Sequence, residues 1–208
     1  METQLVLSFL MTSVMLALIP GPDNLFVLTE SITNGKRNGI IISAGLASGI
    51  IIHTLVIAAG LSIIIQNSPY FLFGIKIIGA LYLFYLAYLT YKEGAIDATP
   101  TKSDHNEKLG MLTLYKKGFL MNVLNPKVTL FFIAFLPQFV TNNGYDFPVQ
   151  IVVLGIIFML QSFFVFSFIS IVAGEFRQLL KSKLFWKNVQ WIKMCILIIL
   201  GGGIILLE

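Results

Sequence analysis

The chain lacks the residues that most redox, metal and nucleotide-dependent proteins use. It has one cysteine among 208 residues, Cys195, and two histidines, His53 and His105. A single cysteine excludes a disulfide within the chain and any Cys-x-x-Cys redox or zinc motif. The sequence also contains no Walker-type phosphate loop and no His-Glu-x-x-His motif. We therefore expect no cofactor, no bound metal and no enzyme activity.

Charge is also scarce. Charged residues make up 12% of the sequence and hydrophobic residues 57%, whereas an ordinary soluble domain is about 25% charged. This composition indicates an integral membrane protein that is surrounded by the lipid bilayer. The net charge of +4 does not suggest a nucleic-acid partner, because the basic residues lie in separate loops without an aromatic reading surface.

Six apolar segments reach the length of about 20 residues that a helix needs to cross a bilayer core about 30 Å thick. The polar connection 92–113 separates the first three segments from the last three. We therefore predict an all-α membrane protein with six transmembrane helices in one domain, 1–208, composed of the halves 1–91 and 114–208. The predicted helices are 5–28, 40–65, 69–91, 114–140, 149–173 and 189–207.

Basic residues are distributed unevenly among the connections between these segments. The first, third and fifth connections carry eleven Lys or Arg residues, and the second and fourth carry none. Because cytoplasmic loops accumulate Lys and Arg, we expect the odd-numbered connections, with the linker 92–113, in the cytoplasm and both termini outside. The eleven residues are Lys36, Arg37, Lys92, Lys102, Lys108, Lys116, Lys117, Arg177, Lys181, Lys183 and Lys187.

Two proline motifs interrupt the apolar segments. The first segment contains Pro-Gly-Pro-Asp-Asn at 20–24, and two prolines around a glycine break a helix. The fourth segment contains Asn-Pro-Lys at 125–127. Backbone groups freed inside a membrane must find partners in the protein or in a water-filled cavity. When the second proline of the first motif is set on Pro126, Asp23 matches Lys127, so ions of opposite charge occupy equivalent positions.

Three helices per half place similar halves in opposite orientations in the membrane. Such an inverted repeat is the plan of many secondary transporters, whose binding sites lie near the midplane where corresponding helices are broken. We therefore predict two inverted three-helix repeats, with the first and fourth helices broken at their proline motifs. His53 and Gln161 lie at similar depths in the second and fifth helices, which supports the pairing.

The two oppositely charged residues at the breaks, Asp23 and Lys127, are the leading site candidates. An ion near the bilayer centre costs about 2.5 to 3.5 kcal/mol on insertion scales, so such residues are functional by default. A purely structural ion pair is the alternative. For a zwitterionic substrate, Asp23 and the carbonyls near Pro20 would bind the ammonium, and Lys127 with the amides that follow Pro126 would bind the carboxylate. The predicted substrate-binding residues are Pro20, Gly21, Pro22, Asp23, Asn24, Asn122, Asn125, Pro126, Lys127 and Gln161.

His53 and Asp23 are the candidates for proton coupling. Histidine titrates near neutral pH, which suits a proton carrier, although a buried histidine also serves as a plain hydrogen-bonding partner between helices. Gly45, Gly49 and His53 are spaced by four on one helix face. Small residues at this spacing favour close packing of helices, and a homodimer interface is the alternative.

These residues, in this order, resemble the lysine-exporter (LysE/RhtB) family of bacterial amino-acid exporters over essentially the whole chain. The resemblance rests on the motif 20–24, on Gly45, Gly49 and His53, and most strongly on the run 117–127 that continues to Leu-Pro-Gln-Phe at 136–139. It implies export of amino acids across the bacterial plasma membrane, driven by the proton gradient or the membrane potential. From the paired breaks we expect alternating access, in which rocking of the two halves exposes the site to each side in turn. The Pro-Gly-Pro-Asp form is similar to the branch for neutral amino acids such as homoserine, threonine and leucine.

Other functions stay open as alternatives. A basic amino acid such as lysine or arginine would meet one intramembrane acid, Asp23, and three intramembrane lysines that repel it. A metal cation would find Asp23 without the cluster of cysteine, histidine or carboxylate ligands that it prefers. An intramembrane enzyme, the least expected alternative, would need a nucleophile with a base or a metal cluster.

The charge pattern predicts where the carboxyl terminus lies. A reporter that is active only outside the cytoplasm, fused after Glu208, should be active in intact cells, because both termini are expected on the external face. The same reporter fused after Arg37, in the first cytoplasmic connection, should be inactive. A silent reporter after Glu208 would refute the predicted orientation.

Overall fold

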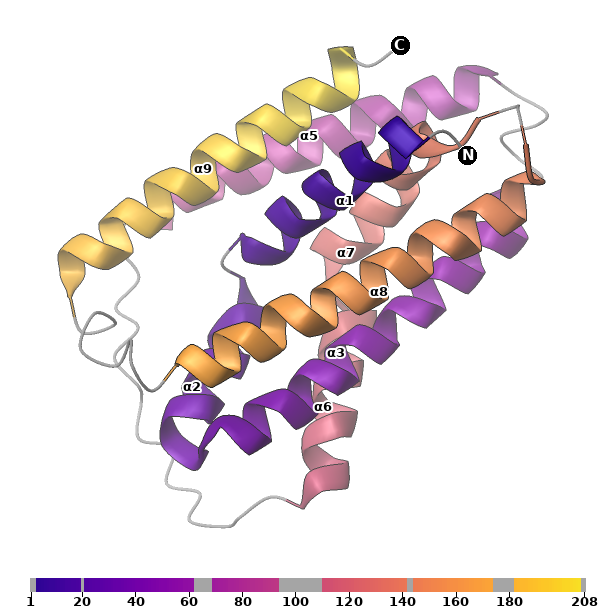
Figure 1. Ribbon diagram of the computed structural model, residues 1–208. Helices are drawn as coiled ribbons and strands as arrows, with labels where there is room; N and C mark the ends of the chain where they lie inside the picture. Colours follow the sequence, from indigo (N-terminus) through magenta and orange to yellow (C-terminus); the bar gives the residue numbers. More distant parts are fainter. Residues whose placement is uncertain are drawn as a thin grey trace.

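The computed structural model describes residues 3–19, 21–61, 69–93, 110–141, 144–173 and 182–206. All regular elements within these ranges are helices, which confirms the predicted all-α class (Figure 1). In chain order they are α1 (Thr3–Leu18), α2 (Pro22–Asn34), α3 (Lys36–Val56), η1 (Ile57–Leu61), α5 (Pro69–Glu93), α6 (Met111–Val123), α7 (Pro126–Leu130), η2 (Phe131–Phe135), η3 (Leu136–Phe139), α8 (Phe147–Val172) and α9 (Lys183–Leu206).

The helices follow the six predicted apolar segments. The first segment is covered by α1 and α2, and α2 continues to Asn34, beyond the predicted end at 28. The residue that follows α2 is Gly35, whose φ of 94° is a left-handed conformation that favours glycine. Within the predicted linker 92–113, residues 94–109 lie outside the described part of the chain.

Two unbroken stretches in the described ranges, Lys36–Gly60 and Phe147–Val172, are long and apolar enough to cross a membrane. The number rises to four if each bent helix pair counts as one span. The third and sixth predicted spans correspond to α5 and α9, which have 25 and 24 residues. The count of six spans and the inverted repeat therefore stay predictions, while a multi-pass membrane protein agrees with the helices observed.

Both predicted breaks are present. The axes of α1 and α2 differ by 61°, and those of α6 and the stretch Pro126–Phe139 differ by 47°. Pro22 and Pro126 each occupy the first helical position after the break, where the missing N–H costs nothing. The fourth segment departs from a regular α-helix after α7, because it continues as the π-helical η2 and the short 3₁₀-helix η3, which contains Pro137.

The helices α3 and α6 touch through their backbones. A Cβ atom on Gly45 would overlap the carbonyl oxygen of Tyr115, and a Cβ atom on Gly118 would overlap that of Ile42. The Tyr115 hydroxyl also donates a hydrogen bond of 2.8 Å to Ser48 Oγ. This contact joins a helix of the first half of the chain to a helix of the second.

The other long helices form pairs that surround α1. Figure 1 shows α3 and α8 running alongside each other and α5 beside α9, with α1 between the two pairs, in agreement with their contacts. The Gln190 side chain donates a hydrogen bond to the Thr90 carbonyl, and Gly201 lets the Phe84 ring approach α9 closely. The α5–α9 pair is thus held by both polar and packing contacts.

The described core contains two apolar clusters. The large cluster is centred on aromatic rings of α1, η2, η3 and α8, which include Phe9, Phe131, Phe132, Phe135, Phe139 and Phe158. The small cluster consists of Val27, Ile42, Leu46, Leu114 and Phe166. The polar residues of the two break motifs lie where these clusters approach each other, and the candidate site is there.

The backbone contact between α3 and α6 makes a specific stability prediction. Gly118→Ala should lower the free energy of unfolding by about 1–3 kcal/mol, because the added methyl group has to push the two helices apart. Thermal unfolding of the purified protein in detergent measures this change. Gly74→Ala is the matched control, because a Cβ on Gly74 meets nothing within 4 Å. Equal melting temperatures for the two variants would contradict the contact.

Candidate functional site

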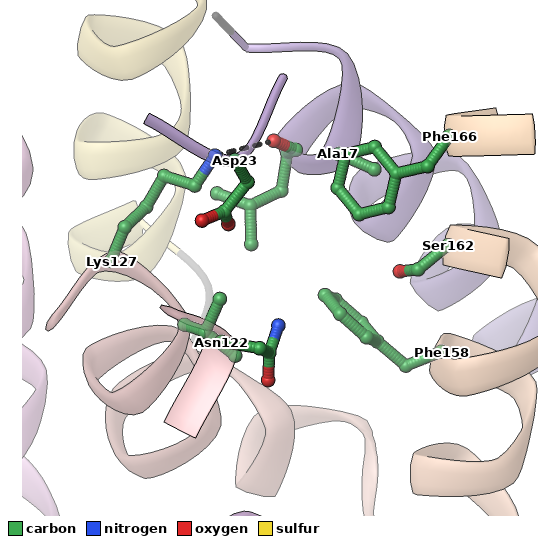
Figure 2. A pocket seen from close by; sticks show the side chains of 9 residues that line it. Ala17, Asp23, Asn122, Lys127, Phe158, Ser162 and Phe166 are labelled. Atoms are coloured by element: carbon green, nitrogen blue, oxygen red, sulfur yellow. Dashed lines mark hydrogen bonds between the residues drawn. The ribbon is translucent and has the colours of Figure 1, made fainter. Parts of the chain in front are cut away.

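A small cavity lies between the two helix breaks and α8. Its volume is about 10 Å³, which is about the space of one water molecule, so a larger ligand could enter only if the walls moved apart. Figure 2 shows polar side chains from the breaks on one side and residues of α8 on the other. The lining residues are Leu16, Ala17, Asp23, Asn122, Lys127, Val128, Phe158, Ser162 and Phe166.

The end of α1 is held by side chains that lie beyond the breaks. Because Pro20 has no N–H, the carbonyl of Leu16 loses the helical donor four residues ahead. Lys127 Nζ lies 3.3 Å from the carbonyl oxygens of both Leu16 and Ile19. The Asn24 side chain donates a 2.8 Å hydrogen bond to the carbonyl of Ala17. Asn24 thus replaces a backbone donor that the break removes, and Lys127 adds a second donor to the Leu16 carbonyl, which also accepts a 3.3 Å hydrogen bond from the Ile19 N–H.

Asn125 connects the two breaks. Its Oδ1 accepts a 3.0 Å hydrogen bond from the backbone N–H of Lys127 and so caps the amino terminus of α7. Its Nδ2 donates a 2.5 Å hydrogen bond to Asp23 Oδ2. Asp23 is 2% exposed and lies in the first turn of α2, where the helix dipole favours a negative charge. One side chain therefore positions α7 and the buried carboxylate together.

His53 supports the second break from α3. Because Pro126 has no N–H, the carbonyl of Asn122 loses its donor four residues ahead. This oxygen instead accepts a 2.9 Å hydrogen bond from the Asn125 backbone N–H. His53 Nε2 lies 3.1 Å from the same oxygen, so that nitrogen carries the hydrogen. This contact fits a hydrogen-bonding role between helices, and the role of His53 in proton coupling stays a prediction.

Asp23 and Lys127 lie close together but do not form a direct ion pair within the described residues. The Asp23 carboxylate is bound by Asn125, and the Lys127 ammonium is bound by carbonyls of the α1 end. Figure 2 shows both side chains on the same side of the cavity. The opposite charges therefore attract each other across a short gap, while Asn125 links the breaks through Asp23 and Lys127 links them through the α1 carbonyls.

Of the other predicted site residues, Asn122 lines the cavity, whereas Gln161, Pro22 and Pro126 do not. Asn122 lines the cavity and is 2% exposed, and its Oδ1 has no hydrogen-bond partner in the described part of the chain. Gln161 lies behind the wall, where its Nε2 donates to the Ser13 carbonyl at 3.3 Å and to Ser162 Oγ at 2.9 Å. Pro22 and Pro126 are exposed.

Gly21, Gly49 and Pro20 are the remaining residues that the sequence singled out. Gly21 precedes α2 in an extended conformation, with Lys127 Nζ 3.6 Å from where its Cβ would lie. Gly49 lies against the Asn122 side chain. Pro20 lies outside the described residues. In the described ranges no three His, Cys, Asp or Glu residues are close enough to share a metal ion.

Sequence reasoning missed the α8 wall of the cavity. Phe158, Ser162 and Phe166 are spaced by four residues, so they lie on one face of α8, and all three line the cavity. The signal was present, because a serine between two phenylalanines at helical spacing marks a face with one polar group. It was hidden by the high apolar content on every side of this helix.

The fold and cavity are those of a helical membrane protein with a polar site between two broken helices. The sequence matches the family described as LysE type translocator over residues 14–207. The chain therefore belongs to the LysE type translocator family.

Several curated relatives are similar over most of their length. The uncharacterized membrane protein YrhP of Bacillus subtilis is 28% identical over 205 residues, which cover 96% of each chain. The leucine efflux protein of Klebsiella pneumoniae is 28% identical over 82% of this chain and 79% of its own. The leucine efflux protein of Salmonella choleraesuis is 28% identical over 81% and 78%. No solved structure matches the chain.

The double role of Asn125 can be tested by substitution. Asn125→Ala should lower the free energy of unfolding by at least about 2 kcal/mol, because it removes a helix cap and the donor to a buried carboxylate. Thermal unfolding in detergent measures the change. Asn34→Ala, at an exposed asparagine that contacts Glu30, should change stability by no more than about 0.5 kcal/mol. An Asn125→Ala protein as stable as this control would contradict the bridging role.

Proposed function

We propose that the protein is a secondary active exporter of neutral amino acids, which pass through the cavity between the two breaks. Membership of a translocator family and two relatives named leucine efflux proteins support amino-acid efflux. The observation that carries the proposal is a cavity lined by a buried carboxylate, Asp23, and by two side chains that can donate hydrogen bonds, Asn122 and Ser162. These groups complement the two charges of a zwitterion.

Asp23 binds the substrate ammonium in this proposal. Its Oδ2 accepts a hydrogen bond from Asn125, and a carboxylate has a second oxygen, here Oδ1, that can accept further hydrogen bonds. The carboxylate lines the cavity, so Oδ1 is available to a ligand. A charge-assisted hydrogen bond from an ammonium to a buried carboxylate is among the strongest polar contacts in proteins.

Asn122 and Ser162 bind the substrate carboxylate. Figure 2 shows the amide nitrogen of Asn122 and the hydroxyl of Ser162 directed toward the cavity. Ser162 Oγ already accepts from Gln161, so its own hydrogen is free to donate to a ligand. This assignment replaces Lys127 as the carboxylate partner, because the Lys127 ammonium is bound to carbonyls of α1.

The apolar walls favour an apolar substrate side chain. Phe158 and Phe166 face the cavity from α8, and Leu16 and Val128 line it from the breaks. A lysine or arginine substrate would bring a second cation toward Lys127, which repels it. The chemistry of these walls therefore favours a neutral amino acid such as leucine over a basic one.

Alternating access requires the cavity to open on one side at a time. Phe158 and Leu16 belong to the large apolar cluster and Phe166 to the small one, so both clusters border the cavity. At the predicted cytoplasmic end, Ser170 Oγ accepts a 2.9 Å hydrogen bond from Ser31 and donates a 2.8 Å one to the Lys36 carbonyl. Separation of these contacts would open the cytoplasmic side. Asp23 and His53 are the proposed residues for coupling to protons.

Counterflow of labelled leucine in proteoliposomes tests this function. The wild-type protein should accumulate label when unlabelled leucine is present inside, and Asp23→Asn should abolish this accumulation because the ammonium loses its counter-charge. Ser162→Ala should raise the KM for leucine by about tenfold or more, the effect of losing a hydrogen bond to a charged group.

A buried serine elsewhere provides the control for Ser162. Ser43 bonds to the Gly39 carbonyl within its own helix, so Ser43→Ala should leave the KM unchanged. Competition by 3-methylbutylamine and by 4-methylpentanoate, each lacking one charged group of leucine, should be weak in comparison with leucine. No counterflow by the wild-type protein with any neutral amino acid would refute the proposed function.

A further inference from the structure

The Lys127 ammonium occupies a place that suits a substrate ammonium. It contacts the carbonyl oxygens of Leu16 and Ile19 at 3.3 Å each. These carbonyls belong to the end of α1, the negative end of the helix dipole. Asp23, which begins α2 just beyond the break, adds a full negative charge. Lys127 is partly buried and lines the same cavity as Asp23.

A lysine side chain and an amino-acid substrate carry the same kind of group here. Both present an ammonium with three N–H donors and no acceptor. Two such ions beside one buried carboxylate repel each other strongly, because the surroundings screen charge poorly. The electrostatics therefore favour one ammonium near Asp23 at a time.

We propose, on the basis of the proposed export function, that Lys127 is a tethered cation that neutralises Asp23 in the empty transporter and withdraws when the substrate ammonium binds. The buried carboxylate is then compensated in both states, by Lys127 when the site is empty and by the substrate when it is full. The empty transporter can then reorient its site from one side of the membrane to the other, because the buried Asp23 carboxylate always has a compensating cation.

The local geometry allows Lys127 to move. Its two hydrogen bonds of 3.3 Å are longer than the usual 2.7–3.2 Å for N–H to oxygen contacts. The ammonium is carried on a flexible four-carbon stem. The backbone N–H of Lys127 stays fixed by the Asn125 cap, so the ammonium can leave the carbonyls while the start of α7 keeps its place.

Two transport assays distinguish this role from direct substrate binding. Exchange of leucine against leucine uses only the loaded transporter, whereas net efflux into leucine-free buffer also needs the empty transporter to return. Lys127→Met should retain exchange with a lower KM for leucine, because the competing cation is gone. Its net efflux should fall by about tenfold or more, because the empty transporter has an uncompensated Asp23.

A second variant moves the leucine KM in the opposite direction and keeps the positive charge. Lys127→Arg retains donors for the α1 carbonyls and is expected to fold. Its planar guanidinium offers five donors, so it should hold these carbonyls more firmly and raise the KM for leucine in exchange. Lys117→Met is the matched control, because the Lys117 ammonium lies over the Phe26 ring at 4.5 Å and does not line the cavity. Both transport rates should be unchanged in this control.

The outcomes separate the two proposals. A wild-type protein without leucine counterflow would refute the export of leucine before any variant is compared. With an active wild type, equal loss of exchange and net efflux in a folded Lys127→Met protein would overturn the tethered cation, as would retention of both. If Lys127→Met does not fold, a KM for Lys127→Arg at or below that of the wild type would overturn it.

Discussion

A proline has no amide hydrogen, and inside a membrane each carbonyl that loses its helical donor needs another one. Here Pro20 and Pro126 create this need at two places, where nearby backbone amides, Ile19 N–H and Asn125 N–H, supply one donor each and distant side chains supply another. Lys127 serves the carbonyl of Leu16, and His53 serves that of Asn122. Each break is therefore stabilised in part by a side chain from the other half of the chain. The need for these donors also places polar groups next to the cavity.

The position of the cavity follows from the same requirement. Polar residues of the breaks have to be buried, yet the large and small apolar clusters cannot hydrogen-bond to them. They gather between the clusters, where Asp23 is bound by Asn125 and the α1 carbonyls are bound by Lys127 and Asn24. A zwitterion is the kind of ligand that such a layer can take up, because the layer already contains separated donors and acceptors.

Much of this architecture could be predicted from the sequence, and the reasons are local. Proline breaks, apolar length and scarce charge are properties of single segments, so the all-α fold and both breaks followed directly. The double hydrogen bonding of Asn125 and the approach of Lys127 to α1 depend on tertiary packing. Ser162 could not be ranked, because a serine in an apolar helix usually bonds to its own backbone. Pairing Asp23 with Lys127 by charge alone overlooked the carbonyls that compete for the ammonium.

The glycine contact between α3 and α6 has a mechanical consequence. Where Gly45 and Gly118 bring two backbones together, no side chain remains between the helices that a rotamer change could rearrange. Helices in such contact are expected to move together as one rigid α3–α6 unit, although they come from opposite halves of the sequence. In the proposed export cycle, the hinge that opens the cavity would then run along other helix contacts, such as those of α2 and α8 with this α3–α6 unit. The moving parts of the protein thus need not coincide with the halves of its chain.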